Sequence, residues 1–238
     1  MESAVQLVVS IRPLRGQSDL DAAVVLQQAV WGYSDLEVDS RGILTVASNF
    51  AGQVLGAFHQ QSLIGFSLAF ATLPFGRLHS HRVGVLPGYQ NLGIGRMLKL
   101  AQREDALARN VPIIQWTFDP LQSRNAHLNL VRLGGIARTY LPNFYGVTSS
   151  PLHGGLPTDR LLIEWELESE RVRKILGGEA PPQSDQVCTL RLPPPGERRN
   201  PEVQARLRSE LVALFAENYA LTGFREQGDE QIYVLEKL

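Results

Sequence analysis

Two glycines and an arginine, Gly93, Gly95 and Arg96, stand together where a predicted strand (77–86) gives way to a long helical pattern (93–109). Glycine has no side chain, so backbone N–H groups at the start of a helix can approach a ligand closely. The positive end of the helix dipole favours an anion at the same place, and Arg96 adds a cation. These residues predict a site for a phosphate or pyrophosphate.

A dinucleotide site would use glycines differently. It has the pattern Gly-x-Gly-x-x-Gly opening directly from a strand, with an acidic residue after the next strand. Asp119 fits the acid, but Leu98 stands at the third glycine and residues 86–92 separate the strand from Gly93. A nucleotide-dependent oxidoreductase therefore stays only as a remote alternative.

The elements that position this segment follow from hydrophobic periodicity. The predicted strands cover residues 5–14, 52–59, 62–73, 77–86, 112–118, 136–141, 159–167 and 187–192. The predicted helices cover residues 19–31, 40–49, 93–109, 123–133 and 201–219. A hairpin at 223–236 closes the chain, and Ser18 is the expected N-cap of the first helix. This order predicts an α/β fold of the α+β type, with a mixed, mostly antiparallel sheet flanked by helices.

Length and composition set the class of protein. A chain of 238 residues predicts one main domain (1–176), a Gly/Pro-rich linker (177–186) and a small C-terminal βαββ appendage (187–238). With 44% hydrophobic and 20% charged residues, wholesale disorder is excluded. The net charge of −1 argues against a nucleic-acid surface or a polybasic membrane anchor. Cys188 is the only cysteine, and neither a leader segment nor a membrane-spanning run is found, which predicts a soluble cytoplasmic protein.

The segment Gln90-Asn91-Leu92-Gly93-Ile94-Gly95 resembles the Gln/Arg-x-x-Gly-x-Gly/Ala signature of the GNAT superfamily of N-acetyltransferases. The resemblance covers about residues 10–167. One branch of the superfamily is similar in the segments His79-Ser80-His81 and WTFDPLQSRNA (116–126). The resemblance implies a GNAT-like fold and an N-acyltransferase that uses acetyl-CoA or another acyl-CoA, with no metal.

The resemblance also implies how the co-substrate binds. Backbone groups of residues 83–85 would pair with pantetheine like an added strand, and amides of residues 91–96 would hold the pyrophosphate. The expected cofactor-binding residues are Val83, Gly84, Val85, Gln90, Asn91, Leu92, Gly93, Ile94, Gly95, Arg96 and Asn125. An amine of a small molecule or peptide would attack the acyl group directly, so the protein would position, polarise and move protons.

The usual general acid of the family is missing. Members often carry a tyrosine four residues before the glycine that closes the following helix. Aligned on Gly134, this chain has Leu130 at that position. A non-catalytic acyl-CoA-binding protein on the same fold is therefore the alternative function.

Three other residues are candidates for acid–base chemistry: Asp119, His81 and Tyr145. His81 shares a strand face with His79, and histidine as a residue type can take a proton from an ammonium, although a pair of structural histidines is the alternative. Asp119 could bind the amine or act as base, or simply begin the next helix. Tyr145 could present its phenol to the leaving thiolate, or only pack. Exposed strand edges make a homodimer the expected assembly.

Overall fold

The computed structural model describes residues 7–33, 37–146, 157–198 and 200–238. The chain divides into two compact units, Met1–Val111 and Pro112–Leu238. The domain boundary expected at 177–186 falls within the second unit and remains a prediction.

The first unit is built on an antiparallel meander. Its strands are β1 (Val9–Pro13), β2 (Gly52–His59), β3 (Ser62–Ala71) and β4 (Arg77–Val85), which pair in that order. Its helices are α1 (Gly16–Trp31), α2 (Arg41–Val46) with a π-helical extension η2 (Ala47–Ala51), the 3-10 turn η3 (Pro87–Tyr89) and α3 (Ile94–Ala108). The predicted elements of this half are confirmed, with small shifts at their ends.

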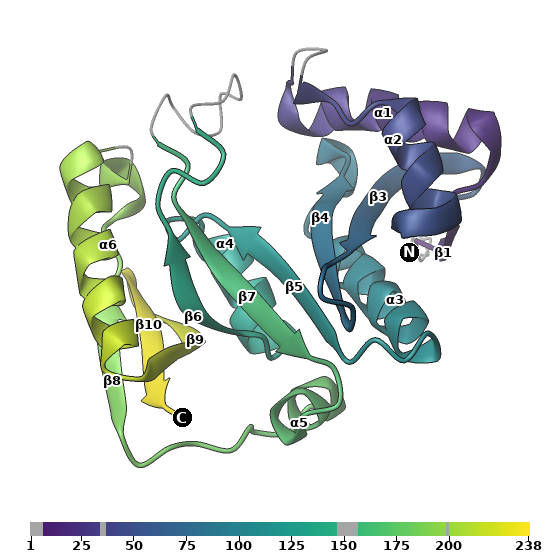
Figure 1. The fold of residues 1–238 in the computed structure, drawn as a ribbon. Coiled ribbons are helices and arrows are strands. Elements are labelled where there is room, and N and C mark those ends of the chain that lie inside the picture. The colour runs from purple at the N-terminus through teal and green to yellow at the C-terminus, as the bar shows by residue number, and fades with distance from the viewer. Residues whose placement is uncertain (1–6, 34–36, 147–156, 199) are drawn as a thin grey trace, which may run out of the picture. The chain divides into compact units, whose positions relative to one another are not determined.

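Helices cover both faces of this meander (Figure 1). On one face, Leu20, Ala23 and Leu26 of α1 pack with Phe66 and other side chains of the sheet. On the other face, α3 contributes a second apolar cluster that includes Leu98. Because both faces are covered, β2 and β3 are buried almost without interruption along their length, and their sequences read as continuous apolar runs.

The described part of the second unit contains six strands. They are β5 (Ile113–Phe118), β6 (Ile136–Leu141), β7 (Arg160–Glu166), β8 (Val187–Arg191), β9 (Tyr219–Gln227) and β10 (Glu230–Lys237), in the spatial order β5-β7-β6-β9-β10-β8. Its helices are α4 (Ser123–Ala126), continued by the π-helical η4 (His127–Arg132), α5 (Glu170–Gly177), the 3-10 turn η6 (Pro195–Glu197) and α6 (Pro201–Ala216). Each strand pairing recorded in this unit is antiparallel.

The expected fold class is confirmed: a mostly antiparallel sheet with flanking helices and a C-terminal series of strand, helix and hairpin. Among the described residues, no helix is both long and apolar enough to cross a membrane.

Several local expectations are wrong. Ser18 is not an N-cap, because α1 begins earlier, at Gly16, and the Asp19 carboxylate accepts a hydrogen bond from the Arg15 amide at 3.1 Å. The sequence reading also missed α5, although Ser169 caps it by accepting from the Val172 amide. The helix predicted at 123–133, by contrast, is present, as one α-helical turn that widens into a π-helix.

Candidate functional site

Two hydrogen bonds tie the loop after β4 back to β3 and β4. The Leu86 amide donates to the Ile64 carbonyl of β3 at 2.9 Å. The Gln90 side-chain amide then donates to the Val85 carbonyl at 3.1 Å. Gln90, the first residue of the glycine signature, therefore braces the short loop that leads from the strand to the start of α3.

Helix α3 begins at a glycine that provides no capping side chain. Gly93 is the N-cap residue and has a φ of 80°, in the left-handed region that favours glycine. The Met97 amide makes the first turn's hydrogen bond, to the Gly93 carbonyl at 3.0 Å. The amides before Met97 precede that bond and point out of the helix end, and the first turn contains no acidic residue. The start of α3 is thus suited to an external anion.

The fold itself does not require a glycine at position 95. A Cβ atom built there would have no heavy atom within 4 Å, apart from its chain neighbours and the helix backbone nearby. Glycine inside a helix is less stable than alanine by roughly 0.5–1 kcal/mol. Gly95 therefore leaves open space beside the first turn of α3 without any gain in packing.

Gly84, by contrast, is required by packing. A Cβ atom on Gly84 would lie 2.8 Å from the Trp31 ring, which covers this part of β4 from the end of α1. The sequence reading assigned Gly84 only to the cofactor, and the structure adds this second reason for a glycine.

A β-bulge in β4 changes which side chains share a face. Ser80 pairs with Ala69 and Arg82 pairs with Leu68, so His81 is the extra residue. His81 and Arg82, although consecutive, both contact Asp39: Arg82 Nε donates to Oδ2, and His81 Nε2 lies 3.4 Å from Oδ1. The bulge therefore gathers two cationic or titratable groups around one carboxylate.

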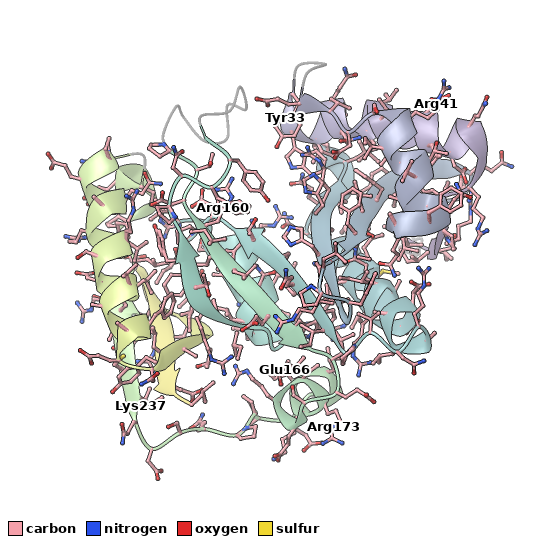
Figure 2. All side chains as sticks on the ribbon, in the orientation of Figure 1. Tyr33, Arg41, Arg160, Glu166, Arg173 and Lys237 are labelled. Atoms are coloured by element: carbon pink, nitrogen blue, oxygen red, sulfur yellow. The ribbon has the colours of Figure 1, made fainter. Side chains whose placement is uncertain are left out.

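The rest of the first unit holds Asp39 and Arg82 in place. The buried side chain of Gln27 in α1 bonds both to the Asp39 amide, at 2.9 Å, and to its carbonyl, at 3.0 Å. The Arg82 guanidinium lies 5.2 Å from the ring centre of Trp31 and 4.9 Å from that of Tyr33, which is labelled beyond the end of α1 in Figure 2. Asp39 is thus fixed on its backbone side, and Arg82 lies beside two rings that stack on each other at 5.8 Å.

His79 and Lys99 form a second polar group beside this one. The rings of His79 and His81 are 6.5 Å apart, which places them on one face as predicted. Burial, together with the nearby His81 and Lys99, lowers the pKa of His79 to about 4. Lys99 of α3 donates to the Ser80 hydroxyl at 2.8 Å, and burial holds its pKa well below the usual range. His79 is therefore neutral near pH 7.

In the second unit, the C-terminal segment holds the turn after β5. Tyr233 donates its hydroxyl proton to the Pro120 carbonyl at 2.6 Å, and Arg198 donates to the Leu121 carbonyl at 3.0 Å. Burial, with a further contribution from the Asp119 charge, raises the pKa of Tyr233, so its hydroxyl stays protonated. The sequence reading missed Arg198 and Tyr233 because both lie far along the chain from this turn.

Asp119 lies inside that turn. Its carboxylate accepts from the Leu121 amide at 2.8 Å, and its carbonyl accepts from the Gln122 amide at 3.0 Å. The N-cap of α4 is Gln122, so Asp119 shapes the turn that leads into the helix without capping it. Its part in catalysis stays a prediction.

The remaining expected site residues of the second unit are Tyr145 and Asn125. Tyr145 is 42% exposed, and its hydroxyl lies 3.1 Å from the Thr117 hydroxyl of β5. Asn125 lies exposed on α4, and Leu130, at the position of the family tyrosine, is fully buried. The structure thus groups residues 83–96 in one strand, loop and helix start, whereas Asp119, Asn125 and Tyr145 belong to the other unit.

No group of three or more His, Cys, Asp or Glu side chains in the described part of the chain is arranged to hold a metal ion.

Sequence comparisons identify no relatives: no protein-family model matches the chain, and no curated protein matches it. Solved structures do match. The ribosomal-protein-S18-alanine N-acetyltransferase of Escherichia coli matches 68% of this chain and 96% of its own, with a TM-score of 0.55 and 17% identity. NAA60 of Arabidopsis thaliana, solved with a bisubstrate analogue, matches 66% of this chain and 98% of its own, with a TM-score of 0.54 and 16% identity.

A third match is the PaiA N-acetyltransferase of Thermoplasma acidophilum, solved in complex with coenzyme A. It matches 67% of this chain and 99% of its own, with a TM-score of 0.51 and 17% identity. The fold of this chain is therefore that of the GNAT N-acetyltransferases, as the glycine signature predicts. That fold differs from the parallel βαβ unit of a dinucleotide site, because the strands before Gly93 form an antiparallel meander.

Proposed function

We propose that this protein is an acyl-CoA-dependent N-acyltransferase that uses acetyl-CoA most simply. The observation that carries the proposal is the start of α3. Gly93 begins the helix in a left-handed conformation and makes no side-chain cap hydrogen bond, and Gly95 leaves open space beside the first turn. The GNAT fold supports the same conclusion, because its solved examples include N-acetyltransferases and one complex with coenzyme A.

The residues around this helix start would hold acyl-CoA as a second substrate. Amides of residues 91–96 would bind the pyrophosphate, and the backbone of residues 83–85 would pair with pantetheine. The acceptor is an amine of a small molecule or peptide, with no part for nucleic acid or a membrane. Transfer forms a C–N bond and breaks the C–S bond of the thioester, which leaves CoA as the thiol. We place the activity in the cytoplasm and expect a homodimer.

A ligand panel tests the proposal directly. Thermal unfolding is followed with acetyl-CoA, CoA, NAD and NADP in separate titrations. A ligand at about 100 times its Kd adds roughly 2.7 kcal/mol to the free energy of unfolding. We expect this stabilisation from acetyl-CoA and CoA alone. Stabilisation by NAD or NADP alone, or by none of the four, contradicts the proposal.

A matched pair of glycine variants locates the site. Gly95 and Gly42 are each the second residue of a helix, and each has room for a Cβ atom. Gly95→Leu and Gly42→Leu should change stability to a similar, small extent. Only Gly95→Leu should weaken acetyl-CoA binding, because its side chain is larger than the glycine or alanine that the signature admits and enters the space that the ligand occupies. Equal affinity in both variants would place the ligand elsewhere.

One observation favours the second candidate, an acyl-CoA-binding protein that does not transfer the acyl group. Leu130 stands at the position of the family tyrosine and is fully buried. Thiol release from acetyl-CoA in the presence of L-lysine, an alanyl tripeptide or an aminoglycoside separates the two. Binding without release by any acceptor favours the second candidate.

A further inference from the structure

We propose that Asp39 and His81 form the base of the transfer reaction, with Asp39 orienting the imidazole and His81 accepting a proton from the acceptor ammonium. This inference rests on the proposed function and assigns a role that the glycine site does not supply. The structure places a carboxylate, that of Asp39, opposite the imidazole of His81, one of the three candidates from the sequence (Asp119, His81 and Tyr145).

The geometry defines which ring nitrogen would take the proton. His81 Nε2 faces Asp39 Oδ1 at 3.4 Å, so an ionised Asp39 accepts from an Nε2–H group. The other nitrogen, Nδ1, then carries the lone pair. The His81 side chain is 25% exposed, so it is not sealed from solvent. An imidazole ordered in this way by a carboxylate is suited to act as a general base.

Asp39 is ionised and held still. Burial raises its pKa, but the hydrogen bond with His81 and the charge of Arg82 outweigh that effect and lower it. Gln27 binds the backbone of Asp39 on both sides. Asp39 therefore orients His81 without needing the substrate to arrange it.

The other groups facing His81 do not compete for this role. Arg82 stays protonated, because the Asp39 carboxylate keeps its pKa raised in spite of burial. His79 on the same strand is a poor base, with its pKa lowered to about 4, first by burial. From β3, the neighbouring group is the Phe70 ring, 5.8 Å from the His81 ring.

The proposed step balances. The ammonium gives one proton to His81 Nδ1, and His81 passes it on to solvent. The free amine attacks the thioester carbonyl carbon, forming the C–N bond, and the C–S bond breaks. The second proton leaves the nitrogen for the departing thiolate, so the products are the amide and CoA as a thiol.

The kinetic test compares kcat/KM for the acceptor against pH in four proteins: wild type, His81→Gln, Asp39→Asn and His59→Gln. His59 lies on β2, bonded to the Val8 carbonyl, and serves as a histidine control. His81→Gln should lower kcat/KM by roughly 10²–10⁴-fold near pH 7 and remove the acidic limb of its profile. Asp39→Asn should lower kcat/KM by a smaller factor, because the imidazole loses the carboxylate that orients it. An unchanged profile in His81→Gln overturns the inference.

The proposed tautomer of His81 can be measured without any substrate. Long-range ¹H–¹⁵N NMR of the histidine side chains reports the tautomer of His81 in the full-length protein. We expect the Nε2–H form in wild type and a mixed population in Asp39→Asn. An Nδ1–H form in wild type overturns the inference, since the lone pair would then lie on Nε2, which faces Asp39, and Nδ1 could accept no proton.

Two different results would contradict the proposed function and the role of the Asp39–His81 pair. Wild type that is not stabilised by acetyl-CoA contradicts the proposed function. Wild type and His81→Gln that bind acetyl-CoA equally and transfer the acyl group at equal rates contradict the Asp39–His81 pair alone.

Discussion

Helices α2 and α3 carry a glycine at the same position, the second of the helix, yet the two starts are built differently. In α2, the Ser40 hydroxyl accepts from the Ile43 amide at 3.4 Å and caps the helix. In α3, the N-cap is Gly93, which has no side chain to offer. A side chain therefore caps the first helix, whereas the N-cap residue of the second makes no side-chain hydrogen bond.

The longer helices of the second unit make the same point. Ser169 caps α5, and Asn200 caps α6 by accepting from the Glu202 amide at 2.8 Å. A capped start has already used amides that an anion would need. What distinguishes α3 is therefore a combination: no capping side chain, no acidic first-turn residue and space at Gly95.

The largest effect is expected from a negative charge at the two glycines. Gly95→Asp and Gly42→Asp each place a carboxylate in a first turn, where it favours the helix. Beside bound phosphates the same charge repels, and roughly 2 kcal/mol of repulsion corresponds to about a 30-fold rise in Kd. Isothermal titration with acetyl-CoA should show that rise in Gly95→Asp alone. A similar loss in Gly42→Asp would erase the difference between the two starts.

A smaller effect is expected from the backbone of Gly93. Gly93→Ala forces a side chain into a left-handed conformation, which costs about 1–2 kcal/mol. Urea unfolding at fixed pH measures that loss. Unchanged stability in Gly93→Ala would mean that the first turn of α3 can rearrange. The backbone amides proposed to bind the pyrophosphate would then not be held in one conformation.

Removal of the α2 cap is expected to affect stability only. Ser40→Ala deletes the hydroxyl that accepts from Ile43, and such losses cost about 0.5–1 kcal/mol. The Kd for acetyl-CoA, measured alongside, should stay that of wild type. Weaker ligand binding in Ser40→Ala would show that α2 also contributes to the site.

The smallest effect concerns inorganic pyrophosphate as a fragment of the ligand. At a concentration equal to its Kd, a ligand stabilises the protein by about 0.4 kcal/mol. Differential scanning calorimetry should detect this in wild type and in Gly42→Asp, and the shift should vanish in Gly95→Asp. Stabilisation that persists in Gly95→Asp would place the anion elsewhere.

Much of the fold was predictable because it rests on local patterns. Strands β2, β3 and β5 were predicted from apolar runs between turn residues, and α3 from apolar side chains at helical spacing. α5 was missed although Val172, Ile175 and Leu176 recur at helical spacing in its eight residues. Its Ser169 cap was also visible in the sequence.

Only the glycine-containing part of the candidate site was predictable from the sequence. The glycine signature could be found because Gly93 and Gly95 act through their own backbone and their near neighbours. Asp39 could not, because nothing in its local sequence indicates that it meets His81. The one signal available was its place in the polar stretch after the first predicted helix.

The sequence by itself determined the order of elements, the strand-to-helix segment at residues 83–96 and the uncapped glycine start of α3. These depend on φ preferences and on periodicities of two and 3.6 residues, which neighbouring residues encode. The tertiary structure alone decided that Trp31 requires a glycine at position 84 and that Asp39 meets His81 and Arg82. Those contacts join distant segments, and they depend on a bulge whose single extra residue reorients the side chains along β4.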